Sequence, residues 1–123
     1  MKFDIRVQAA TQFVEEQSDP EAERYVFAYT ITIENCGVES AQLLDRHWII
    51  TDADGQVQEV RGPGVVGEQP LIAPGERFEY TSGAVLKTPV GSMRGSYGMV
   101  GADGSRFDAA IPTFSLSIPR TLH

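Results

Sequence analysis

Apolar residues occupy every second position along much of this sequence, and this pattern limits the folds that the chain can adopt. The alternation is clear at residues 3–9, 25–34 and 107–111. Because successive side chains of a β-strand point to opposite faces, it predicts strands with one buried side. No usable length of chain has the spacing i, i+3, i+4 and i+7 of an amphipathic helix, so we expect an all-β protein.

Turn residues divide the chain into about eight strand-like runs. We expect Ser82-Gly83 to interrupt one run and Pro112 to separate the last two, because proline lacks the N–H that a strand ladder needs. Residues 62–75 are too many for a plain hairpin connection and predict a long functional or flexible loop. The expected runs are 3–9 with a continuation to 14, 25–34, 43–52, 57–61, 78–86, 93–99, 107–111 and 114–118.

Trp48 lies in the third run, where a tryptophan in a two-sheet sandwich packs into the core. By strict alternation Arg46 shares the Trp48 side, with its head reaching solvent near the strand end, whereas Leu43 and His47 lie on the other side. We therefore predict a two-sheet antiparallel β-sandwich of the immunoglobulin or fibronectin type III kind. A length of 123 residues predicts a single domain over 1–123.

Charge and cysteine usage restrict the partners and the compartment. The net charge of −7 repels phosphate backbones and anionic lipid surfaces, so we expect neither nucleic acid nor membrane insertion. Cys36 is the one cysteine and cannot form an internal disulfide, and no basic and apolar signal segment precedes the first run. Together these features predict a cytoplasmic protein.

Residues 62–67 have the spacing G-x-G-x-x-G, which binds pyrophosphate where a strand leads into a helix. A strand is expected before this stretch, but Pro70 and Pro74 prevent a helix after it. Pro63 contributes no N–H, and Glu68 places a negative charge where an anion would lie. We interpret the stretch as a turn whose glycines permit positive φ or close packing.

No catalytic, metal or cofactor site follows from the sequence. His47 and His123 have no metal-ligand spacing, and Cys36 has no neighbouring His or Lys that would lower its pKa. Residues 91–95 do not have the G-x-S-x-G pattern of a nucleophile elbow. We therefore expect a non-enzymatic chain with no cofactor.

Seven blocks of the sequence together carry a resemblance: Gln17–Pro20, Arg24–Tyr29, Leu43–Asp52, Gly64–Pro70, Pro74–Glu76, Tyr80–Gly83 and Gly91–Tyr97. They resemble the bacterial ApaG family, also called CorD. The resemblance implies a fibronectin type III-like sandwich without catalytic residues. It also implies a link to cobalt resistance and magnesium efflux, which we expect to act through a protein partner.

We therefore expect a non-enzymatic interaction module whose recognition surface is the long loop 62–75 with outward groups of the Arg46-His47 region. The alternative is a small-molecule binder that takes nucleotides of the pyrophosphate or diadenosine tetraphosphate type, or divalent cations, through Gly62–Gly67. Self-association through a sheet edge also stays open. The candidate loop residues are Gly62, Gly64, Gly67, Glu68 and Gln69, and the candidate flanking residues are Arg46, His47 and Arg61.

Overall fold

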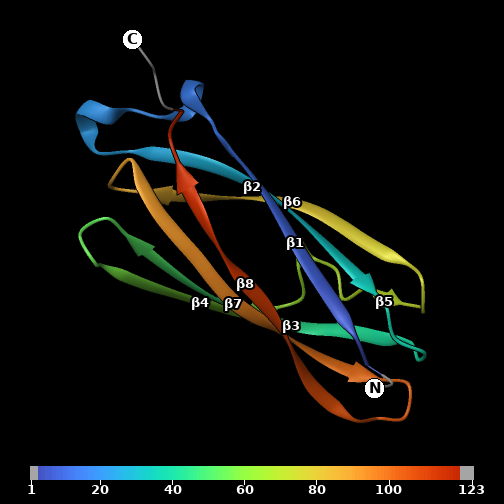
Figure 1. The fold of residues 1–123 in the computed structure, drawn as a ribbon. Coiled ribbons are helices and arrows are strands. Elements are labelled where there is room, and N and C mark those ends of the chain that lie inside the picture. Colours follow the sequence, from blue (N-terminus) through green and yellow to red (C-terminus); the bar gives the residue numbers. More distant parts are fainter. Residues whose placement is uncertain (1–2, 120–123) are drawn as a thin grey trace.

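Two antiparallel β-sheets face one another in the computed structural model, which describes residues 3–119 (Figure 1). This arrangement confirms the predicted β-sandwich. The first sheet has the order β1 (Ile5–Phe13), β2 (Tyr25–Asn35) and β6 (Arg77–Leu86). The second has the order β4 (Val57–Pro63), β3 (Ala41–Asp52), β7 (Val90–Gly101) and β8 (Arg106–Ser117), and the short β5 (Leu71–Ile72) also pairs with β3. Two 3-10 turns, η1 (Glu15–Gln17) and η2 (Pro20–Ala22), join β1 to β2.

Trp48 lies at the centre of the core, as predicted, with 2% of its surface exposed. The rings of Tyr29, Tyr97 and Phe114 approach it edge to face, with centroids 5.4, 6.2 and 5.9 Å away. Tyr29 belongs to the first sheet and the other two rings to the second. Edge-to-face packing is a favourable geometry for aromatic rings, so this cluster ties the two sheets together.

A β-bulge in β3 corrects the predicted alternation. The register with β7 shifts between Leu43 and Asp45, so one extra residue is inserted there. Leu43 is consequently fully buried although its spacing from Trp48 predicts the opposite face. Beyond the bulge the predicted alternation holds, with Trp48 buried and His47 facing outwards.

Two predicted strand breaks and one predicted loop are also wrong. Gly83 pairs with Ala28, and β6 runs through Ser82-Gly83 without interruption. Strand β8 continues through Pro112, because a second register shift leaves Pro112 and Thr113 at a bulge in an edge strand, where proline is tolerated. The segment 62–75 is not one loop, since 62–63 extend β4 and 71–72 form β5.

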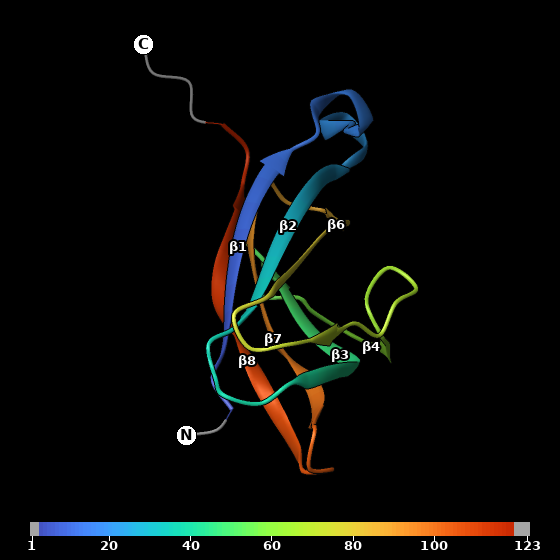
Figure 2. The ribbon, with the colours of Figure 1, turned by 90° about the vertical axis from the view of Figure 1, so that its right-hand side faces the viewer.

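The two long sides of the sandwich differ. On one side the edge strands β1 and β8 lie along one another (Figure 2), and Thr11 Oγ1 donates a hydrogen bond of 3.4 Å to Ser115 O. On the other side the edge strands are β6 and β4, and the segment after β4 projects there as a loop (Figure 2). The side of β4 and β6 therefore carries two strand edges and the loop that follows β4.

None of the helices among residues 3–119 is long and apolar enough to span a bilayer.

Tyr80 and Tyr97 connect the two sheets through a hydrogen bond between their hydroxyl groups, 2.5 Å long. Both side chains are buried, and burial raises the pKa of each phenol well above its ordinary value. Each phenol stays protonated in the folded state but ionises near pH 10 in the unfolded state. Above that pH the ionisation stabilises the unfolded state alone. Stability should therefore fall as pH rises above about 10.

We predict that the free energy of unfolding decreases above pH 10 by about 1.4 kcal/mol per pH unit for each of the two phenols. Urea denaturation between pH 8 and 11 measures this slope. The double variant Tyr80→Phe/Tyr97→Phe is the control, because all other titrating groups are unchanged in it. Equal slopes in the two proteins would contradict the assignment.

Candidate binding site

The chain makes a tight turn directly after β4. We call residues 62–69, which include the last two residues of β4, the clamped loop. Val65 N donates to Glu68 O at 2.8 Å, and Glu68 N donates to Val65 O at 2.9 Å. Gly64, Val66 and Gly67 have φ angles of 60°, 43° and 81°. Glycine takes such positive values without strain, which confirms the conformational interpretation of Gly64 and Gly67.

Arg46 holds the base of this loop. Its Nη1 donates hydrogen bonds of 2.9 Å to both Pro63 O and Gly64 O. Arg46 pairs with Gly62 in the β3–β4 register, and a Cβ atom on Gly62 would lie 3.0 Å from Nη1 and Nη2. Glycine at position 62 therefore gives the guanidinium group room to reach the two carbonyls.

Further contacts fix the loop to the start of β3. Gly64 N and Gln69 Nε2 both donate to Leu44 O, at 2.8 Å each. Val65 is fully buried in the core. A Cβ atom on Gly64 would lie 2.3 Å from Glu68 O, so only glycine fits where the turn closes on itself. The loop is thus anchored by its base, by Val65 and by Gln69.

The tip of the clamped loop remains in solvent. Val66 is 54% exposed, and Gly67 and Glu68 are exposed as well. A rigid turn therefore presents one apolar and one acidic side chain.

The loop backbone is poorly arranged as a phosphate cradle. The amides of Gly64, Val65 and Glu68 already donate to carbonyl groups, and Pro63 has no N–H. Strand β5 follows the loop in place of a helix. A cradle needs several free N–H groups that converge on an anion, and this geometry supplies few of them.

A cleft of about 380 Å³ lies between the clamped loop and the first sheet. The sequence did not predict which residues of the first sheet line this cleft. Alternation alone could have placed them inside, but it could not show that they face Arg46 across the open side. The lining residues are Tyr29, Arg46, Pro63, Val65, Val66, Gly67, Tyr80 and Ser82.

The structure separates the flanking candidates into two places. Arg46 points into the sandwich towards the clamped loop, whereas His47 and Arg61 pair with one another in register on the outer face of the second sheet. There His47 Nε2 lies 2.9 Å from Glu59 Oε1. One compact site cannot include all three residues, and the loop candidates group with Arg46.

Within residues 3–119 there is no group of three or more His, Cys, Asp or Glu side chains that could hold a metal ion. His123 lies outside the described residues. Desolvation and the Glu34 carboxylate raise the pKa of the Cys36 thiol, which disfavours the nucleophilic thiolate.

These features define a small β-sandwich with an ordered loop beside an open strand edge. The family model of the ApaG domain matches residues 15–101. The chain is 65% identical to Protein ApaG of Thiobacillus denitrificans over 122 residues, covering 99% of this chain and 96% of the relative. It is 66% identical to Protein ApaG of Pseudomonas paraeruginosa over 119 residues, covering 97% and 94%.

Among solved structures, a Bordetella pertussis protein described as ApaA superposes with a TM-score of 0.94 at 56% identity, covering 97% of each chain. The chain therefore belongs to the ApaG family.

We predict that Arg46→Gln lowers the free energy of unfolding by about 1–3 kcal/mol, because the Pro63 and Gly64 carbonyls lose a charged donor. Urea denaturation measures the change. Arg61→Gln is the matched control, since Arg61 is exposed on the outer face and should change stability by less than about 0.5 kcal/mol. Equal effects of the two substitutions would show that Arg46 does not hold the loop.

Proposed function

We propose that this chain is a non-enzymatic interaction module that recognises a protein partner with the tip of the clamped loop. The observation that supports this proposal is the contrast within the loop. Its base is fixed by Arg46 and Val65, whereas Val66 and Glu68 at the tip are free to make contacts.

An ordered loop is suited to recognition because it loses little conformational entropy on binding. Val66 supplies apolar surface, and Glu68 supplies a charge that selects a basic or hydrogen-bond-donating group on the partner. Loops at the ends of sandwich strands commonly carry such contacts.

We further propose that the module works in the cytoplasm and that the family's link to cobalt resistance and magnesium efflux acts through this partner. The absence of a three-ligand acidic or histidine group within 3–119 favours an indirect connection to cations over a resident metal site.

We predict that Glu68→Lys and Val66→Asp reduce partner capture several-fold while the free energy of unfolding changes by less than about 0.5 kcal/mol. The measurement is the yield of each crosslinked adduct formed between the tagged protein and a cell extract. His47→Ala removes a side chain from the outer face and should leave the yield unchanged. Loss of capture with His47→Ala, and none with Glu68→Lys, would move the recognition surface to the outer face and contradict the proposal.

A further inference from the structure

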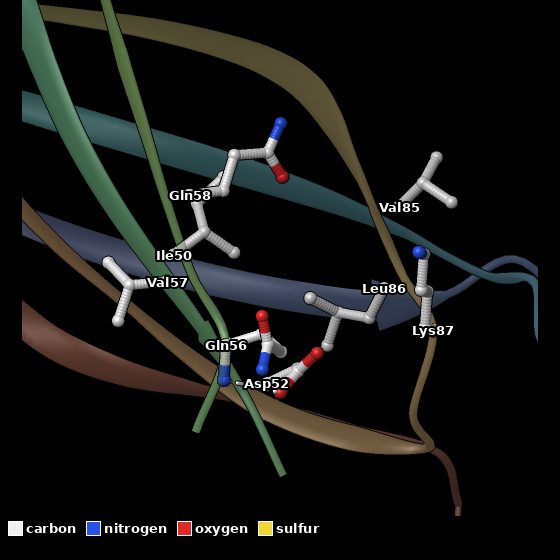
Figure 3. Close-up of a pocket in the computed structure, with 8 residues that line it drawn as sticks. All are labelled: Ile50, Asp52, Gln56, Val57, Gln58, Val85, Leu86 and Lys87. Carbon is white, nitrogen blue, oxygen red and sulfur yellow. Dashed lines mark hydrogen bonds between the residues drawn. The ribbon is translucent and has the colours of Figure 1, made fainter. Parts of the chain in front are cut away.

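Two hollows follow one another along β6 on the open side of the sandwich. The first is the cleft beside Arg46. The second has a volume of about 180 Å³ and lies near the far end of β4 (Figure 3). Its walls combine apolar side chains of both sheets with polar groups at the rim. The lining residues are Ile50, Asp52, Gln56, Val57, Gln58, Val85, Leu86 and Lys87.

Arg46 lines the first hollow and retains unused donors. Nη1 donates its N–H groups to the carbonyl oxygens of Pro63 and Gly64. Nε and Nη2 donate to no acceptor within 3–119, and neither of them is buried. These two nitrogens form the edge of a guanidinium group that binds a carboxylate through two parallel hydrogen bonds.

The surroundings of Arg46 favour a carboxylate on a largely neutral ligand. Arg46 is the one charged side chain among the residues that line the first hollow, and Tyr29 and Ser82 add hydroxyl groups to its wall. The net charge of −7 repels a polyanion at long range. A single carboxylate gains the local attraction of Arg46 with little of that repulsion.

The second hollow favours an apolar side chain. Ile50 and Leu86 form its inner wall, and Val57 and Val85 are 62% and 46% exposed at its mouth. Exposed apolar side chains that surround a concavity are typical of a binding surface. Asp52 and Lys87 have opposite charges, so the second hollow favours neither a positively nor a negatively charged ligand group.

The distance between the hollows is set by strand geometry. Arg46 and Ile50 are four residues apart on one face of β3, and Ser82 and Leu86 are four residues apart on β6. Four residues of a strand span about 13 Å, and side chains at i and i+4 point to the same face. An extended ligand along this side therefore reaches both hollows with side chains four positions apart.

The strand edges provide backbone partners for such a ligand. Strands β6 and β4 are the outermost strands of their sheets on this side. An edge strand presents N–H and C=O groups to which an extended peptide can add as a further strand. On the opposite side β1 and β8 lie along one another (Figure 2), and the hollow of about 440 Å³ between them has no charged side chain in its lining.

We propose that the open side between β4 and β6 binds an extended segment of a protein partner that carries a carboxylate side chain and a large apolar side chain four residues apart. The carboxylate pairs with Nε and Nη2 of Arg46, and the apolar side chain enters the hollow between Ile50 and Leu86. This inference rests on the proposed function and specifies which chemistry the partner presents beside the clamped loop.

Fluorescence anisotropy with labelled eight-residue peptides tests the spacing directly. The probe peptide alternates threonine and serine, with glutamate at the second position and leucine at the sixth. One control replaces the glutamate by glutamine, and another moves the leucine to the fifth position, which turns it to the opposite face. Each control should bind about tenfold more weakly than the probe. Equal binding of all three peptides would overturn the proposal.

Variants of the protein test which hollow binds the glutamate of the probe peptide and which binds its leucine. Arg46→Gln should abolish the preference for the glutamate peptide over the glutamine peptide. Because this variant also loosens the loop, Val57→Asp provides an independent arm, and it should weaken the probe about tenfold while Arg46 is intact. Val38→Asp is its matched control, since Val38 is 76% exposed and lines neither hollow. If both aspartate variants bind the probe equally, the apolar contact does not exist.

The two proposals fail in different ways. Peptide binding that ignores glutamate and spacing, together with partner capture that still depends on Glu68, removes only the peptide site. The opposite result is specific peptide binding combined with partner capture that does not change when Glu68 or Val66 is substituted. In that case the loop tip is not the recognition surface, and the strand edges are.

Discussion

The hydrogen bonds from Arg46 to the carbonyl groups of Pro63 and Gly64 determine how the side of β4 and β6 is built. A half-buried guanidinium group needs acceptors, and two backbone carbonyls at the end of β4 provide them without a second charge. The same contacts fix where the chain leaves β4. Arg46 lies two residues before Trp48, so one strand both centres the core and positions the loop.

The contacts that join the two sheets include the packing of Tyr29 on Trp48 and the hydrogen bond between Tyr80 and Tyr97. This packing holds the sheets together, while β4 and β6 remain the outer strands on one side. Arg46 fills part of the space between them and leaves an accessible cleft. The fold thus combines a rigid centre with a side where two strand edges and one cation are accessible together.

The sequence predicted the strands well because alternation records which side of each strand is buried. It also placed Trp48 inside and interpreted the glycines of 62–67 as a turn with positive φ or close packing, because both features depend on local chemistry. Positive φ is found at Gly64 and Gly67. The bulges near Leu44 and Pro112 escaped prediction, since an inserted residue changes pairing without changing composition. The grouping of Arg46 with Tyr29 and Ser82 escaped it too, because this contact depends on how two sheets pack and not on spacing along the chain.

Residue-resolved hydrogen exchange of the native protein tests most directly whether the loop is held at its base and free at its tip. The amides of Gly64 and Val65 donate to Leu44 O and Glu68 O, so they should exchange slowly, with protection close to that of the neighbouring strands. The amides of Val66 and Gly67 at the tip should exchange much faster. Exchange at Gly64 and Val65 as rapid as at Gly67 would show that the loop is not clamped and would contradict the account.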